Sequence, residues 1–140
     1  MVKKLPQKPT NLRPYSCNSI INNQRFTRLE ISPYYEKHNQ EYLVALEKKG
    51  IRLSPNELSE KLITDDLICE LVRKLDGEKV DSEGRYYHWT YYSFRVYRGI
   101  KAYKLVWCVA DDEPSILGLI DCYRQGWKDK KINKNQKSNF

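Results

Sequence analysis

The side chains best suited to chemistry gather in the last third of the chain, as a mixture of cations and aromatic rings: Arg85, Tyr86, Tyr87, His88, Trp89, Tyr91, Tyr92, Arg95, Tyr97, Arg98, Lys101, Tyr103, Lys104, Tyr123 and Arg124. Aromatic rings stack on unpaired bases, at about 1 to 3 kcal/mol each, and Arg or Lys neutralises backbone phosphate. The mixture therefore favours contact with RNA or another single strand. A purely structural explanation stays open, because aromatics are good strand formers and cations commonly decorate an exposed sheet face.

Motifs of other catalytic classes are missing from the sequence. It has no glycine-rich phosphate loop, no nucleophile elbow and no paired histidines at helical spacing. Its four cysteines, at positions 17, 69, 108 and 122, form no CxxC pair, and only His38 and His88 are available to complete a metal set. We therefore expect no metal and no cofactor, and we expect Cys69, Cys108 and Cys122 to be reduced core residues.

Two to three helices are predicted between residues 32 and 77, after a short strand at residues 26–31. Each helix has a start signal: Ser32 before Pro33, Ser54 three residues before Glu57 in a capping-box arrangement, and Thr64 before two acids. Gly50 and Gly77 mark the ends of the first and the third helix. The third helix has the clearest apolar stripe, which favours packing on a sheet.

Three strands are predicted after the helices, at residues 86–98, 101–110 and 116–124, with a turn at 111–115. Both faces of 101–110 are largely apolar, as expected at the centre of a sheet. The predicted fold is α+β, with the helices on a four-stranded, mainly antiparallel sheet whose last three strands form a meander. One domain, residues 25–126, would lie between a basic, loosely packed extension, residues 1–24, and a basic flexible tail, residues 127–140.

Composition points to a soluble protein with an anionic partner. The 140 residues carry a net charge of +7 and are 31% charged, and their mean hydropathy is −0.76. No apolar run approaches the roughly 20 residues needed to cross a bilayer, so we expect no membrane association and a cytoplasmic location. Much of the positive charge lies near the two ends of the chain, where either a solvated tail or a binding arm would explain it.

The order of elements and the last segments resemble the RelE/ParE superfamily of type II toxins. The resemblance rests on "SFRVYRG", "YKLVWCV" and "SILGLIDCYR", separated by an acidic turn. In that family a basic residue precedes a Tyr-Arg-like pair, and an Asp-Asp turn leads to an apolar strand that ends in a basic residue. The matching positions here are Arg95 or Arg98, Tyr103-Lys104, Asp111-Asp112 and Arg124.

The resemblance implies a small ribonuclease that needs no metal, acts on messenger RNA, often at the ribosome, and is neutralised by an antitoxin protein. The 2′-hydroxyl of the RNA would be the nucleophile, so the protein would supply cations and proton-transfer groups. Lys104 and Arg124 would stabilise the phosphate, and Tyr123 or His88 would exchange protons or stack on a base. Substrate contacts would come from Arg95, Arg98, Lys101 and Tyr87.

Several alternatives stay open. A noncatalytic nucleic-acid- or protein-binding module would use the same basic aromatic face, and an accessory protein would use only its basic tails. Some relatives in the superfamily bind gyrase rather than cut RNA, so the fold would not settle the activity. His38 is either a surface residue or a catalytic or substrate contact. Lys104 and Arg124 would lie at one edge of a hairpin, but strand parity leaves open whether they point to one face.

Overall fold

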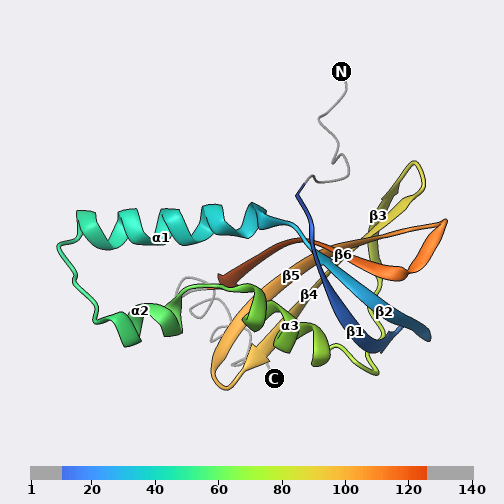
Figure 1. Ribbon diagram of the computed structural model, residues 1–140, viewed down its shortest axis with the longest axis horizontal. Coiled ribbons are helices and arrows are strands. Elements are labelled where there is room, and N and C mark those ends of the chain that lie inside the picture. Colours follow the sequence, from blue (N-terminus) through green and yellow to red (C-terminus); the bar gives the residue numbers. More distant parts are fainter. Residues whose placement is uncertain (1–10, 126–140) are drawn as a thin grey trace, which may run out of the picture.

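The computed structural model describes residues 11–125 as an α+β fold with one mixed sheet of six strands. The order of strands across the sheet is β1-β2-β6-β5-β4-β3 (Figure 1). The strands are β1 (Arg13–Ile21), β2 (Gln24–Ile31), β3 (Ser82–Tyr86), β4 (Trp89–Arg98), β5 (Lys101–Ala110) and β6 (Glu113–Gln125). Among the strand pairs of residues 11–125, only β2–β6 is parallel. The expected α+β class and the central position of β5 are confirmed, whereas the expected four-stranded sheet is too small.

The helices start where the sequence predicts. They are a 3-10 turn η1 (Pro33–Tyr35), α1 (Glu36–Lys48), α2 (Pro55–Lys61) and α3 (Asp65–Arg73). Ser54 and Glu57 form the reciprocal capping box, and the Thr64 hydroxyl accepts a hydrogen bond from the Leu67 N–H at 3.1 Å. The Ser32 hydroxyl accepts from the Tyr34 N–H at 3.2 Å, so this cap opens η1 and α1 follows directly.

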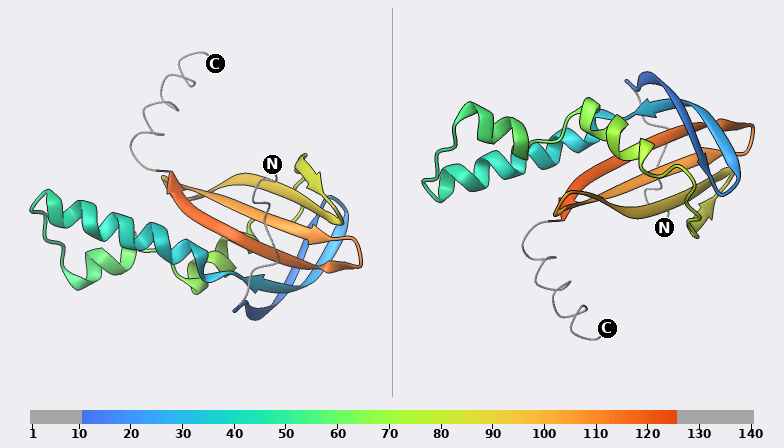
Figure 2. Two further views of the ribbon diagram at one scale, coloured as in Figure 1. Left: turned by 90° about the horizontal axis from the view of Figure 1, so that it is seen from above. Right: turned by 90° about the horizontal axis from the view of Figure 1, so that it is seen from below.

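The core lies between α3 and one face of the sheet. Four residues of α3 are buried: Leu67, Ile68, Leu71 and Val72. They meet buried side chains from several strands, including Leu29, Val96, Leu105, Trp107 and Leu117. Each such side chain contributes roughly 1.5 to 3 kcal/mol when it leaves water. Figure 2 shows α3 against this face, which we call the inner face; the opposite side of the sheet is the outer face.

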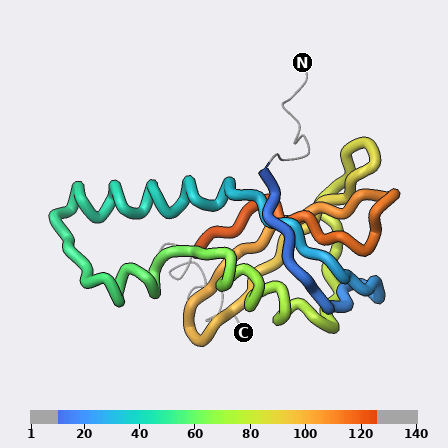
Figure 3. Tube along the Cα trace, in the orientation of Figure 1, coloured from blue at the N-terminus to red at the C-terminus, as the bar shows by residue number. Residues whose placement is uncertain are grey.

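Helices α1 and α2 project away from the sheet as an arm (Figures 1 and 2). Neither helix buries a residue. The base of the arm is fixed by the Asn39 side chain, which donates to the Ile63 carbonyl at 2.8 Å and accepts from the Ile63 N–H at 2.9 Å. The chain therefore leaves the sheet after β2, runs through the arm and returns along α3 (Figure 3).

Among the described residues the sheet begins at Arg13, within residues 1–24, which were predicted to form a loosely packed extension. Strand β1 alternates half-buried with exposed residues and pairs with β2 through a turn at Asn22 and Asn23, whose φ angles are +56° and +65°. Asparagine tolerates this left-handed backbone, and two such residues suit a tight hairpin. In the sequence, the Asn22-Asn23 pair was the signal for a hairpin, and therefore for strand β1, which was not predicted. The parts of the extension and tail at 1–10 and 126–140 lie outside the described residues.

The segment predicted as one strand from residue 86 to 98 is a hairpin instead. Strand β3 ends at Tyr86, Tyr87 turns the chain with a φ of +56°, and β4 begins at Trp89. Strand propensity is high on both sides of the turn, so the run of aromatic residues was predicted as one continuous strand. Near the same end of these strands β6 begins at Glu113 and includes Pro114, which was predicted to lie in a turn.

A polar cluster around Asp65 joins β1, η1 and α3. The guanidinium of Arg13 donates to the two Asp65 oxygens at 2.7 and 2.8 Å, and the Tyr35 hydroxyl donates at 2.6 Å. The Tyr15 hydroxyl donates to Asp65 as well. These donors, Arg13 first, lower the pKa of Asp65 to about 2. The cluster gives β1 a fixed place beside α3, because it satisfies polar groups from all three elements at once.

The ionised Asp65 is expected to stabilise the fold above about pH 4. Its folded pKa, about 2, lies below the ordinary value of 3.8, so the contribution is lost as the pH falls from about 4 towards 2. Allowing for solvent screening, we expect Asp65→Asn to lower the free energy of unfolding by roughly 1 to 3 kcal/mol at pH 7, and by less at pH 3. Urea unfolding at both pH values measures this.

The matched control is Asp66→Asn, because Asp66 is the neighbouring acid in the same first turn of α3 and is exposed. It is expected to change the free energy of unfolding by less than about 0.5 kcal/mol. Equal losses in the two variants, or a loss in Asp65→Asn that does not shrink at low pH, would contradict the role given to Asp65.

Candidate active site

The register of β5 and β6 separates Lys104 from Arg124. Lys104 lies opposite Tyr123, and Tyr103 lies opposite Arg124. Side chains opposite one another point to the same face, and successive side chains alternate. Tyr103 is buried on the inner face, so Arg124 points to the inner face and Lys104 and Tyr123 point to the outer face. The two cations therefore do not meet at one anion site.

Lys104 belongs to a row of polar side chains that crosses the outer face. Arg95 on β4, Lys104 on β5 and Tyr123 on β6 lie opposite one another in register. Neighbours in such a row have Cβ atoms about 5 Å apart. The Arg95 guanidinium donates to the Gln125 side chain, so it reaches across β5 towards β6. Two positive charges thus lie beside one phenol, all half-buried.

A histidine from the arm meets this row. The His38 Nε2 lies 3.0 Å from an Asp121 carboxylate oxygen, and the His38 ring lies 5.4 Å from the Tyr123 ring, centre to centre. The side chains of His38 and Asp121 are 28% and 15% exposed. His38 Nδ1 lies 3.5 Å from Glu41, whose side chain is 62% exposed. This distance is longer than that of a normal hydrogen bond.

Contacts with neighbouring residues fix the position of His38 beside β6. The Ser32 N–H donates to the Leu119 carbonyl at 2.9 Å, which fixes the start of η1 beside β6 just before α1. The Tyr34 ring packs edge-on against the His38 ring at 5.9 Å.

Asp121 follows an irregularity in β6: Val106 pairs with Asp121 whereas Trp107 pairs with Leu119, so Ile120 is an extra residue. Such bulges re-aim side chains and are common beside active sites. The Asp121 carboxylate also accepts from the Cys122 N–H at 2.8 Å.

We call His38, Asp121, Tyr123, Lys104 and Arg95 the outer-face site. A carboxylate that bonds one nitrogen of an imidazole orients the ring and stabilises its charged form, leaving the other nitrogen to accept or donate a proton. The adjacent Lys and Arg can stabilise negative charge that develops on a phosphate. Together these groups can move protons and stabilise a phosphoryl transition state without a cofactor.

The other residues predicted for the site lie elsewhere. Arg98 pairs with Glu70 of α3 at 2.8 Å, and both Arg98 and Arg124 influence buried Tyr103 on the inner face. Burial raises the pKa of Tyr103, and these two cations oppose that rise. The Nε of Arg124 is buried without a hydrogen-bond partner among the described residues. Lys101, at the β4–β5 turn, donates to the Glu60 carbonyl at 3.3 Å.

Tyr87 and His88 form the turn at the far end of β4. Tyr87 is 73% exposed, and the His88 carbonyl accepts from the Asp111 N–H at 2.9 Å. Trp89 pairs with Ala110, six residues along β5 from Lys104, which corresponds to roughly 20 Å. These two residues are therefore not part of the outer-face site, and neither are Arg98, Lys101 and Arg124. Of the eight predicted residues, the structure brings together Lys104, Tyr123 and Arg95.

His38 gains a role that the sequence alone left undecided, and Asp121 was missed. The signal for Asp121 was a carboxylate between apolar neighbours in a strand otherwise read as core. No spacing rule joins it to His38, because 83 residues separate the two.

Comparisons with known proteins identify no relative: no protein-family model, curated protein or solved structure matches the chain. Within residues 11–125, no group of three or more His, Cys, Asp or Glu side chains could hold a metal ion. In the same residues no helix has both the length and the apolar character to cross a membrane.

Proposed function

We propose that the protein is a metal-independent endoribonuclease of the RelE-like toxin kind, acting on single-stranded or ribosome-bound messenger RNA. The observation that carries this proposal is the His38–Asp121 pair, 3.0 Å apart, beside Tyr123, Lys104 and Arg95 on one sheet face. The order of elements also supports the resemblance, because β2, the helices and β4 to β6 follow the expected order. Strands β1 and β3 extend the sheet at its two edges.

The proposed reaction is an internal phosphoryl transfer. The 2′-hydroxyl of the RNA attacks the adjacent phosphorus and gives its proton to His38 Nδ1, while Asp121 stabilises the imidazolium that forms. Lys104 and Arg95 stabilise the charge on the nonbridging oxygens. As the bond from phosphorus to the 5′-oxygen breaks, that oxygen takes a proton from the Tyr123 hydroxyl. The products are a 2′,3′-cyclic phosphate and a 5′-hydroxyl, and a proton passing from His38 to Tyr123 restores the enzyme.

The proposal predicts cleavage of RNA in the presence of EDTA, with no cleavage of a strand that carries 2′-deoxyribose throughout. Purified protein is incubated with labelled single-stranded RNA, alone and with translating ribosomes, and the product ends are identified by mass spectrometry. We expect 2′,3′-cyclic phosphate ends. Expression in bacteria is expected to arrest growth, and coexpression of an acidic antitoxin partner to relieve it.

Three results would contradict the proposal. RNA that stays intact both with and without ribosomes would show that the protein is not a ribonuclease. RNA that is bound but never cut would support the alternative, a noncatalytic nucleic-acid-binding module that uses the same basic aromatic residues. Loss of cleavage on addition of EDTA would show that the reaction needs a metal that the outer-face site does not supply.

A further inference from the structure

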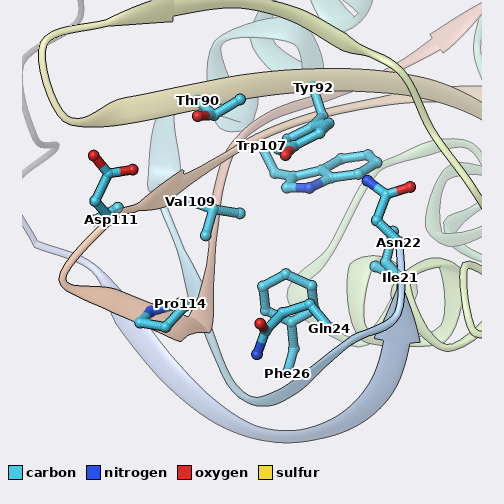
Figure 4. Close-up of a pocket in the computed structure, with 11 residues that line it drawn as sticks. Ile21, Asn22, Gln24, Phe26, Thr90, Tyr92, Trp107, Val109, Asp111 and Pro114 are labelled. Atoms are coloured by element: carbon cyan, nitrogen blue, oxygen red, sulfur yellow. The ribbon is translucent and has the colours of Figure 1, made fainter.

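Strand β4 carries aromatic rings on the outer face that the outer-face site does not use. The side chains of β4 that point outward are Trp89, Tyr91, Ser93, Arg95 and Tyr97. The intervening residues point inward, and Figure 4 shows one of them, Tyr92, beside Trp107 at a pocket of the inner face. Those two inner rings stack with their centres 5.5 Å apart. The three outward rings do not belong to the hydrophobic core of the described residues, so they are available for contacts on the outer face.

Two of these rings lie on either side of Arg95 along the strand. Tyr97 is two residues from Arg95 and Tyr91 is four, which corresponds to roughly 7 and 13 Å. Tyr97 is 51% exposed, and Tyr91 is half-buried. The left view of Figure 2 looks onto the outer face, and no helix of the described residues lies in front of β4, β5 and β6 there. Part of each ring therefore remains open to a partner on the side of the sheet that carries Lys104.

The surface beside Tyr91 is low. Tyr91 lies opposite Cys108 on β5, and Cys108 lies opposite Gly118 on β6. A Cβ atom at Gly118 would be only 3.3 Å from the Cys108 sulfur, closer than an ordinary van der Waals contact, so the sulfur takes the place of a side chain there. Between this row and the outer-face site, β4 and β5 contribute only Ser93 and Val106. A planar base can lie over these small side chains with its face against the Tyr91 ring.

The charges around the rings favour one orientation of a bound strand. Lys104 and Arg95 supply positive charge between the two rings. On the β3 side, the Glu83 carboxylate accepts a hydrogen bond from the Ser93 hydroxyl at 2.8 Å. Negative charge at Glu83 repels phosphate, whereas Lys104 on β5 attracts it. These charges favour phosphates over β5 and bases over β4, where the rings are.

We infer that the outer side of β4 is a stacking track for single-stranded nucleic acid, in which Tyr97 and Tyr91 each hold a base, on opposite sides of the phosphate bound at Lys104 and Arg95. Aromatic side chains on the face of a sheet stack RNA bases in other folds. The inference rests on the proposed function for the position of that phosphate, but it does not require that the strand be cut. It adds that the ligand is an unpaired strand of any sequence, because every base has a face that can stack.

Fluorescence anisotropy with a labelled eight-nucleotide strand of deoxythymidine tests the inference on the full chain. DNA lacks the 2′-hydroxyl nucleophile, so the proposed reaction cannot cut this probe. The control probe has the same phosphates on abasic sugars. In about 50 mM salt we expect a dissociation constant of about 10⁻⁶ to 10⁻⁴ M for the strand with bases. The abasic strand is expected to bind at least about 5-fold more weakly, because it keeps the charge contacts and loses the stacking.

Leucine and phenylalanine at the two tyrosines separate the ring from its bulk. Tyr97→Leu is expected to weaken binding of the deoxythymidine strand about 5- to 100-fold, and Tyr91→Leu about 3- to 20-fold because less of that ring is exposed. Tyr97→Phe keeps the ring and should stay within about 2-fold of the wild-type affinity. The abasic strand is expected to bind all of these variants equally. Circular dichroism and urea unfolding verify that each variant is folded.

Three results would overturn the stacking track. They are equal affinity of the wild type for the two probes, wild-type affinity of both folded leucine variants, and a loss in Tyr97→Phe as large as that in Tyr97→Leu. The comparison of the two probes needs only the wild type, so it decides even where a variant does not fold. A protein that binds bases through these rings and leaves RNA intact contradicts the nuclease proposal alone. One that cuts RNA while both leucine variants bind like the wild type contradicts the stacking track alone.

Discussion

Alanine in place of His38 is expected to lower the rate of RNA cleavage by about 10²- to 10⁴-fold, the usual contribution of one proton-transfer group. The proposed proton acceptor is the Nδ1 atom of His38, because Nε2 lies 3.0 Å from the Asp121 carboxylate. Removing the ring leaves the cations in place, so RNA should still bind. Single-turnover cleavage and RNA affinity, measured on the same preparations, separate the two effects.

Asp121→Asn is the companion variant, because an amide can orient the ring but cannot stabilise its charge. We expect a smaller loss, of about 10- to 10³-fold, with a changed dependence of the rate on pH.

Glu41→Gln serves as the matched control. The Glu41 carboxylate lies 3.5 Å from His38 Nδ1, and its side chain is 62% exposed. The cleavage rate of the Glu41→Gln variant is therefore expected to stay within about 2-fold of the wild-type rate. If folded His38→Ala cuts RNA as fast as the wild type, His38 has no part in the reaction.

The features predicted correctly from the sequence are those set by near neighbours in the chain. The caps at Ser54 and Thr64 lie within three residues of the groups they bond, so the sequence contains the whole signal. The apolar character of both faces of β5 is likewise contained in ten successive residues, and it correctly predicted the position of β5 between two other strands. Such local agreement is why the α+β class was predictable.

The parts of the site that were not predicted depend on contacts distant in sequence. Whether Arg124 shares a face with Lys104 is set by the register of β5 and β6, and the extra residue Ile120 shifts that register partway along the pair. A shift of one residue turns every later side chain to the other face. His38 meets Asp121 only because β2 lies beside β6, which places the start of the arm next to the last strand.

Alanine at Lys104 and alanine at Arg124 are expected to have very different effects. Lys104→Ala should lower the cleavage rate by about 10²- to 10³-fold, the cost of losing one group that stabilises a developing negative charge. Arg124→Ala should leave the rate of the folded protein within about 3-fold of the wild type, because its side chain points to the inner face beside Tyr103. Rates are compared under single-turnover conditions at saturating protein.

Lys104→Arg and a stability measurement complete the comparison. Arginine keeps the positive charge at position 104 and is expected to recover at least 10-fold of the lost rate, whereas a residue needed only for packing would gain nothing from the charge. Arg124→Ala can still lower the free energy of unfolding, because the Arg124 Nε is buried within the fold. Urea unfolding therefore accompanies each rate.

Comparison of the Lys104→Ala and Arg124→Ala variants shows on which face of the sheet the reaction takes place. RNA that contacts Lys104 and His38 lies on the outer face, and the sheet itself separates it from Arg124. A large loss of rate in stable, folded Arg124→Ala, with little loss in Lys104→Ala, would move the reaction to the inner face and overturn the outer-face site. Large losses in both would require a substrate that passes around the β4–β5 turn, where Lys101 begins β5. Only a loss confined to Lys104 agrees with the chemistry derived from the register.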